Sequence, residues 1–251
     1  MTTIVDRARR IVAGATRRGC RRHPVTVPLP GGRSLRWRED DRYPESMLDG
    51  TYEPDLVNHL LRELTPGATL LDLGANSGYL SFLSKAVVGA AGRVIAVEPH
   101  PDNLATLQDR SRLNPDLPVE VLPAAVAPAT GTVTMHLTRN LANGRIDEAG
   151  WSHQKPAVDT AVVPARSLDD LLTDAAPDVV KIDIEGAEGA VLDASTGPGG
   201  WPTRPVFLVE YHGHDNRDRC LAVARRWGWE TSDEPDAGEL PAGLLVLGPP
   251  R

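Results

Sequence analysis

The chain has 251 residues, of which 41% are hydrophobic and 24% are charged, and its formal net charge at pH 7 is −7. These values fit one large globular domain with additional N-terminal structure, and they exclude a collagen-like or intrinsically disordered chain. Only two cysteines occur, and no apolar run is long enough to span a bilayer. The sequence therefore predicts a cytoplasmic, reduced protein without stable membrane association.

Positive charge is concentrated near the N-terminus. Residues 1–38 contain ten arginines and one acid, Asp6, which leaves a charge of −16 on the remainder of the chain. The helical spacing of apolar residues between Ile4 and Ala15 predicts a basic amphipathic helix, packed on the main domain in preference to a membrane. Because the rest of the chain is acidic, we expect no nucleic-acid partner.

The first elements predicted after this helix are a hairpin over Val25–Trp37 and a helix over Pro54–Leu64. Apolar strands then alternate with helices, which is typical of parallel crossover units in a doubly wound, Rossmann-like α/β sheet. The predicted strands are Thr69–Leu73, Arg93–Val97, Val119–Leu122, Val179–Ile184, Val206–Glu210 and Gly243–Gly248, and the predicted helices cover 78–88, 101–113, 186–195 and 216–227.

An insertion separates the third and fourth strands of this series. Thr132–Leu137 and Thr160–Pro164 predict an inserted hairpin, and the polar segment 138–158 between them, with Trp151, is long enough for a lid or a substrate loop. We expect residues 1–50 to form a substrate or partner surface and residues 51–251 to form the domain that binds the ligand.

A glycine turn follows the first strand, where ligands bind in open parallel sheets. Gly74 and Gly78 let a ligand approach the backbone, but a dinucleotide site would need glycines in place of Asn76 and Tyr79. Asp72 would also repel a pyrophosphate. S-adenosylmethionine has no phosphate and carries an ammonium and a sulfonium, so the pattern favours this ligand. The alternative is a tight turn that binds nothing.

Two further strand ends complete the predicted cofactor site. Glu98 ends the second strand 24 residues after Gly74, where an acid accepts hydrogen bonds from ribose hydroxyls. The end of the third strand, with Ala124 and Ala125, is expected to form the adenine pocket by analogy with the fold.

Titratable residues gather at the ends of the fourth and fifth strands. Asp183 ends the fourth strand, and Glu185 and Glu188 follow it in the turn and the next helix. Glu188 is equally well explained as a complement to the helix dipole. Strand alternation places Glu210 and His212 on one face, and His212 beside Asp183 is the preferred general base, with an idle surface histidine as the alternative.

A divalent metal is the other use that these residues suggest. Hard oxygen ligands suit magnesium, and some methyl-transferring enzymes use a metal to acidify a hydroxyl. The spacing matches no dedicated metal motif, however, so we predict no metal. The residues that would hold Mg²⁺ under this less favoured hypothesis are Asp183, Glu185, Glu210 and His212.

Three motifs together resemble the FkbM family of methyltransferases: Asp72–Gly78, Val97–Pro99 and Lys181–Glu188. Gly50–Pro54 also resembles the lead-in that this family has before its first strand. The resemblance implies a class I methyltransferase sheet of seven strands, the last of them antiparallel. It also implies that S-adenosylmethionine is the cofactor.

The predicted catalytic residues are His212, Asp183 and Glu185. The predicted cofactor-binding residues are Tyr52, Glu53, Asp72, Gly74, Ala75, Asn76, Gly78, Tyr79, Glu98, Pro99, His100, Ala124, Ala125 and Asp183.

Many members of this family methylate hydroxyl groups on natural products or sugars, so the resemblance implies O-methylation of a small-molecule acceptor. An N-methyltransferase acting on an amine or peptide, and a protein that binds the cofactor without catalysis, are the alternatives. A nicotinamide oxidoreductase is disfavoured by Asp72 and Asn76. A homodimer is compatible with the sequence but not specified by it.

Overall fold

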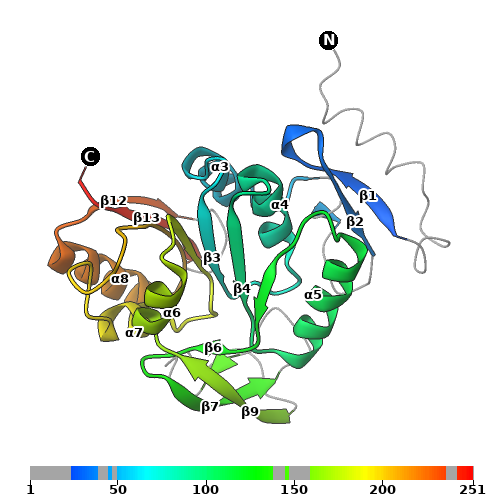
Figure 1. The fold of residues 1–251 in the computed structure, drawn as a ribbon. Helices are drawn as coiled ribbons and strands as arrows, with labels where there is room; N and C mark the ends of the chain where they lie inside the picture. Colours follow the sequence, from blue (N-terminus) through cyan, green and yellow to red (C-terminus); the bar gives the residue numbers. More distant parts are fainter. Residues whose placement is uncertain are drawn as a thin grey trace.

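The computed structural model describes residues 24–38, 45–46, 50–137, 145–146, 159–235 and 242–250. These residues form a central sheet with helices on both faces, an N-terminal hairpin and a smaller inserted sheet (Figure 1). The predicted basic helix at the N-terminus and Trp151 lie outside the described residues.

The central sheet has seven strands in the order β12-β13-β11-β10-β3-β4-β5. The strands β3, β4, β5, β10 and β11 pair in parallel, whereas β13 is antiparallel to both of its neighbours. The predicted seven-stranded, doubly wound sheet with an antiparallel last strand is therefore confirmed. The strands are β3 (Thr69–Leu73), β4 (Arg93–Val97), β5 (Glu120–Leu122), β10 (Val179–Ile182), β11 (Val206–His212), β12 (Glu230–Pro235) and β13 (Ala242–Gly248).

The core has two layers because successive strand residues point to opposite faces of the sheet. Leu70 and Val94 belong to the layer beneath α3 (Pro54–Glu63), α4 (Tyr79–Val88) and α5 (Pro101–Leu113). Their chain neighbours Leu71 and Ile95 belong to the layer beneath the remaining helices. These are α6 (Leu168–Ala175), α7 (Glu188–Ala194) and α8 (His214–Trp227).

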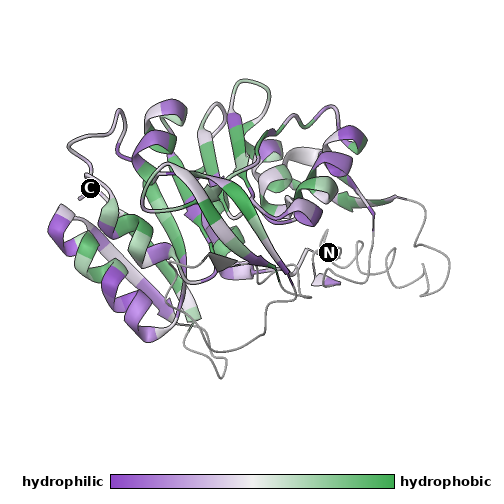
Figure 2. Ribbon diagram, turned by 90° about the horizontal axis from the view of Figure 1, so that it is seen from below, coloured by the Kyte–Doolittle hydropathy of each residue, from purple (hydrophilic) through white to green (hydrophobic). Residues whose placement is uncertain are grey.

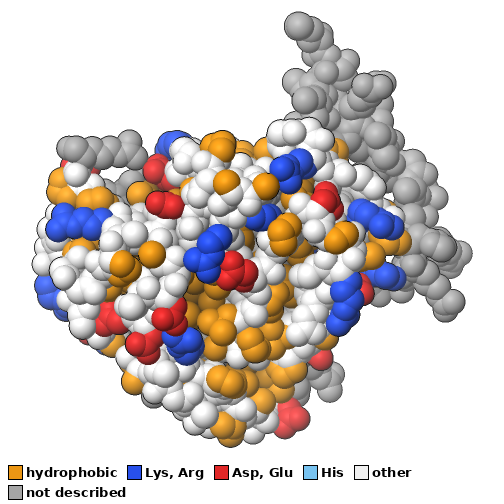
Figure 3. Space-filling model, viewed as in Figure 1, with side chains coloured by type: hydrophobic (Ala, Val, Ile, Leu, Met, Phe, Trp, Pro, Cys, Tyr) orange, Lys and Arg blue, Asp and Glu red, His pale blue; other side chains and the backbone are white. Residues whose placement is uncertain are grey.

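The hydropathy of the residues follows this layered arrangement. The strands and the inner sides of the helices are hydrophobic, and the outer sides of the helices are hydrophilic (Figure 2). On the face seen in Figure 3, acidic and basic side chains are mixed, and apolar side chains gather in its lower centre. Among the described residues, no helix combines the length and apolar character that crossing a membrane requires.

Of the strand ends that differ from the prediction, those of β10 and β11 affect the site. Strand β10 ends at Ile182, two residues early, because the Ile184 amide donates to the Glu188 carboxylate at 3.0 Å instead of to a neighbouring strand. Strand β11 runs two residues further, to His212, because β13 continues to pair with it as far as Ala242.

The N-terminal hairpin of β1 (Val25–Pro28) and β2 (Ser34–Trp37) packs on α5. Leu35 and Trp37 are buried, and the Arg110 guanidinium lies 3.4 Å from the centroid of the Trp37 ring. Asn114 accepts from the Arg36 amide at 2.7 Å and donates to the Arg36 carbonyl at 2.9 Å. The predicted hairpin is thus confirmed and forms part of the core.

The predicted inserted hairpin is confirmed as part of a larger sheet with the order β6-β9-β7-β8. Its strands β7 and β9 are antiparallel, with Met135 opposite Ala161. Strand β6 begins three residues after β5 ends, so the insertion is attached at the carboxyl edge of the central sheet (Figure 1). The strands are β6 (Ala125–Val126), β7 (Gly131–Leu137), β8 (Arg145–Ile146) and β9 (Asp159–Arg166).

Candidate functional site

The glycine turn joins β3 to α4 and lies against the end of β10. Gly74 has a φ of +79°, and a Cβ atom there would lie 1.8 Å from the Asp183 carbonyl oxygen. The amides of Gly74 and Ala75 both donate to the Val97 carbonyl at 3.0 Å. A glycine is therefore required at position 74 by the close approach of two strand ends as well as by the backbone angle.

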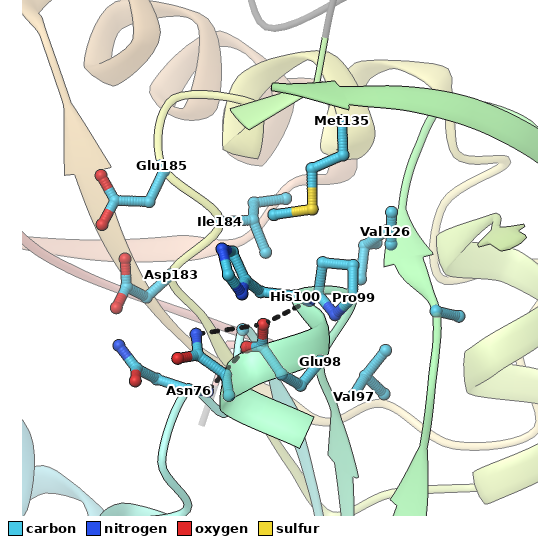
Figure 4. Close-up of a pocket in the computed structure, with 14 residues that line it drawn as sticks. Asn76, Val97, Glu98, Pro99, His100, Val126, Met135, Asp183, Ile184 and Glu185 are labelled. Atoms are coloured by element: carbon cyan, nitrogen blue, oxygen red, sulfur yellow. Dashed lines mark hydrogen bonds between the residues drawn. The ribbon is translucent and has the colours of Figure 1, made fainter. Parts of the chain in front are cut away.

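Glu98 connects this turn to the end of β4. Its side chain is buried, one oxygen accepts from the Asn76 amide at 2.8 Å, and the other accepts from the His100 amide at 2.8 Å and from Asn103 at 3.3 Å (Figure 4). Burial raises the pKa of Glu98, although the hydrogen bonds from His100 and Asn76 oppose that shift. The carboxyl group is thus oriented by the loops on either side of it.

A narrow cavity opens beside Glu98. Figure 4 shows Asp183 and Glu185 on one side of it and Val126 on the other, with Met135 reaching in from the inserted sheet. Val126, Met135 and Ile184 together supply an apolar wall that the sequence did not predict. The predicted residues that line this cavity are Gly74, Asn76, Glu98, Pro99, His100, Ala124, Ala125, Asp183 and Glu185.

A second cavity, of about 630 Å³, lies next to the first. Tyr52 and Glu53, which were predicted to contact the cofactor, line this second cavity. Asn76, Asp183 and Glu185 line both cavities, so the two meet at these residues. The other residues of interest in its wall are Asp55, Glu210, Tyr211, His212 and Glu234.

Four predicted cofactor residues, Asp72, Ala75, Gly78 and Tyr79, are absent from the described lining of both cavities. All four are buried. Tyr79 packs edge-on between Trp37 and Tyr52, with ring centroids 5.8 and 5.7 Å away.

Asp72 faces a buried lysine beneath the site. Lys181 donates to the Gly74 carbonyl at 2.8 Å, and its Nζ lies 3.4 Å from Asp72 and 3.6 Å from Asp183. Burial would lower the pKa of Lys181, but the charges of Asp72 and Asp183 outweigh it and hold that pKa above its usual value. Lys181 is therefore charged, and its contacts link the glycine turn to the end of β10.

His212 lies between two carboxylates. Its Nδ1 is 3.2 Å from Glu188 Oε1, and its Nε2 is 3.8 Å from Asp183 Oδ1. Burial would lower the pKa of His212, but the hydrogen bond with Glu188 and the charges of Glu188 and Asp183 outweigh it and raise the pKa to about 10. His212 is therefore an imidazolium at neutral pH.

Glu188 has a larger role than a complement to the helix dipole. It is fully buried, and it accepts hydrogen bonds from the amides of Ile184 and Gly186 at 3.0 and 3.1 Å and from the Asn216 side chain. The contact with His212 adds to these. Glu188 thus shapes the turn after β10 and orients the histidine.

The predicted alternative metal set is only partly brought together. Among the described residues, the ligand atoms that lie within 4.8 Å of one another belong to Asp183, Glu188 and His212, whereas Glu185 and Glu210 are outside that group. Because backbone amides and Asn216 already occupy the Glu188 oxygens, the group is a hydrogen-bonded ion-pair network.

Comparison with known proteins supports the interpretation of the motifs. The family model described as the methyltransferase FkbM domain matches residues 72–240. No curated protein sequence matches the chain.

Several solved structures are similar to this chain at low sequence identity. The precorrin-6y C5,15-methyltransferase of Geobacter metallireducens is 14% identical, with a TM-score of 0.51 over 79% of this chain and 90% of that chain. An S-adenosylmethionine-dependent methyltransferase of Aquifex aeolicus is 13% identical, with a TM-score of 0.46 over 82% and 94%. The FkbM methyltransferase of Methylobacillus flagellatus is 15% identical, with a TM-score of 0.45 over 83% and 62%.

The family match spans more than half of the chain. The observed sheet is the class I methyltransferase sheet that the motifs implied. This protein therefore belongs to the FkbM family of S-adenosylmethionine-dependent methyltransferases.

Proposed function

We propose that this enzyme methylates a hydroxyl group of a small molecule at the place where its two cavities meet. The observation that carries the proposal is that Asn76, Asp183 and Glu185 line both cavities. The volume of the second cavity, about 630 Å³, is typical of sites for small molecules.

The narrow cavity suits the adenosine part of the cofactor. The buried carboxyl group of Glu98 supplies acceptors for ribose hydroxyls, and Val126, Met135 and Ile184 supply an apolar wall for the adenine. S-adenosylmethionine, when bound, supplies a methyl group already activated on its sulfonium. The protein must then hold the acceptor hydroxyl in line and take up its proton.

Asp183 is the best-placed group to accept that proton. It faces both cavities, and Lys181 and His212 lie 3.6 and 3.8 Å from its two oxygens. His212 was the base preferred from the sequence, but a pKa of about 10 keeps its ring protonated at neutral pH. We therefore assign proton uptake to Asp183 and assign His212 and Lys181 to positioning it. The proton of the acceptor would pass to the Asp183 carboxylate as the methyl group moves from the sulfonium sulfur to the oxygen, which leaves S-adenosylhomocysteine.

The reaction is tested by identifying the product. The full chain is incubated with a metabolite extract and S-adenosylmethionine that carries a ¹³C-labelled methyl group, and the new methyl signal is recorded by NMR. We expect a signal at the chemical shift of a methyl ether. A signal at an N-methyl shift would contradict O-methylation, and the absence of any S-adenosylhomocysteine would contradict turnover of a metabolite.

The cofactor assignment is tested by Glu98→Gln, which keeps the shape of the side chain and removes its charge. Since hydrogen bonds to a charged group contribute about 1.5–3 kcal/mol, we expect affinity for S-adenosylhomocysteine to fall roughly 10- to 100-fold. Isothermal calorimetry measures this change. Glu120→Gln, an exposed acid on β5 outside both cavities, is the matched control. Unchanged affinity in a folded Glu98→Gln protein would refute the assignment.

A further inference from the structure

We propose that the methyl acceptor carries a protonated amine, which binds among the carboxylates of the second cavity. The inference rests on the proposed function, because it takes the second cavity to be the acceptor site. It narrows the acceptor from small molecules in general to cationic ones, and it excludes acceptors that present a phosphate or a carboxylate to this wall.

The lining of the second cavity is strongly acidic. No lysine or arginine among the described residues belongs to it, and its only histidine, His212, is already held between Glu188 and Asp183. The acidic residues in its lining are Glu53, Asp55, Asp183, Glu185, Glu210 and Glu234.

Two of these carboxyl groups are largely buried, and the positive charge of Lys181 only partly offsets the effect of that burial on their pKa values. Glu53 Oε2 is buried and has no hydrogen-bond partner within the described part of the chain. Burial raises the pKa of Glu53 to about 7, and the negative charge of Asp183 acts in the same direction. Burial also raises the pKa of Glu210 well above its ordinary value, with Asp183 and Glu53 adding to the shift. An ammonium group bound between them would stabilise both carboxylates.

An aromatic side chain of the same wall suits a cation as well. Tyr52 lines the cavity together with the acids, and the faces of aromatic rings attract ammonium groups. Carboxylates and aromatic faces in one cavity are the chemistry by which proteins bind amines. A phosphate or carboxylate would meet repulsion there instead.

The cofactor's own ammonium does not account for all of this charge. Glu210 is on β11 and Glu234 is on β12, whereas the glycine turn follows β3. In the sheet, β10 separates β11 from β3, and β13 and β11 lie between β12 and β10. These two acids are therefore on the side of the cavity farther from the cofactor turn, where the acceptor binds.

The test compares three phenols that share one body and differ in charge: tyramine, 4-hydroxyphenethyl alcohol and 4-hydroxyphenylacetate. Each is titrated by calorimetry, at millimolar concentration, into the full chain saturated with S-adenosylhomocysteine. We expect the amine to bind at least roughly tenfold more tightly than the alcohol, and the carboxylate to bind most weakly. Equal binding of the three, preference for the carboxylate, or no binding of the amine would overturn the proposal.

Matched variants locate the amine. Glu210→Gln and Glu234→Gln are each expected to reduce the preference for the amine over the alcohol severalfold, while affinity for S-adenosylhomocysteine stays unchanged. Glu230→Gln, an exposed acid at the other end of β12, is expected to keep the preference. If Glu210→Gln does not fold, Glu234→Gln at the partly exposed rim, where Glu234 contacts His59 at 3.0 Å, gives the result alone. If both variants keep the preference for the amine, the assignment of the amine site is wrong. If the unsubstituted chain does not bind S-adenosylhomocysteine at all, the proposed function is wrong instead.

Discussion

Asp183→Asn is expected to reduce kcat for methyl transfer roughly 10²- to 10⁴-fold, which is the range attributed to a general base. The amide keeps the size of the side chain but cannot take up the proton of the acceptor hydroxyl. Because the Asp183 side chain lies where the two cavities meet, we expect affinity for S-adenosylhomocysteine to change far less than kcat. Steady-state kinetics with the acceptor found by product analysis measures the first quantity, and calorimetry measures the second.

The control for this variant is Asp174→Asn, an exposed acid on α6 that pairs with Arg166 outside both cavities. It should retain the kcat of the unsubstituted enzyme. If Asp183→Asn keeps kcat within a few-fold, proton uptake occurs elsewhere. If kcat and cofactor affinity instead fall together, Asp183 acts in binding and the assignment of the base is wrong.

Gly74→Ala is expected to produce the largest loss of stability of any conservative change at the site. The new Cβ atom would meet the Asp183 carbonyl oxygen at 1.8 Å, and that oxygen belongs to the backbone at the end of β10, so it cannot rotate away. The backbone angle of +79° adds its own cost. We expect a loss of about 3 kcal/mol or more in the free energy of unfolding, measured by urea denaturation.

Gly67→Ala separates the two causes. Gly67 also has a positive φ, +91°, but a Cβ atom there would have nothing within 4 Å. The Gly67→Ala substitution should therefore lower the free energy of unfolding only through the unfavourable backbone angle, by about 1 kcal/mol. Equal losses in the two variants would show that the contact with Asp183 is relieved by a small movement of the turn and that the site tolerates such a movement.

Much of the fold follows from local signals in the sequence. Strands β3 and β4 have the predicted bounds, and α5 begins at Pro101 and ends at Leu113 as predicted, because a proline starts it. Strand β12 has no such signal. The segment Glu230–Pro235 is polar, and it is a strand because β13 supplies its hydrogen-bonding partners, which a reading of local periodicity does not detect.

The sequence predicted which strand ends carry the site residues, but it did not predict which side chains contact one another. Asp183 and His212 were placed together because parallel strands end at one edge of a sheet. The contact of Glu188 with His212 depends on how α7 begins against β11, and the reach of Met135 into the cofactor cavity depends on where the inserted sheet docks. Both arise from tertiary packing between segments that are distant in the chain.

The position of β13 has a consequence for the order in which the enzyme assembles. β13 follows β12 in the chain, yet it lies between β11 and β12, and it is the only sheet neighbour of β12 in the described part of the molecule. The described lining of the narrow cavity ends at Glu185, whereas that of the second cavity includes Glu234 and Leu244. The residues that line the cofactor cavity are therefore translated before the last residues of the wall to which we assign the acceptor.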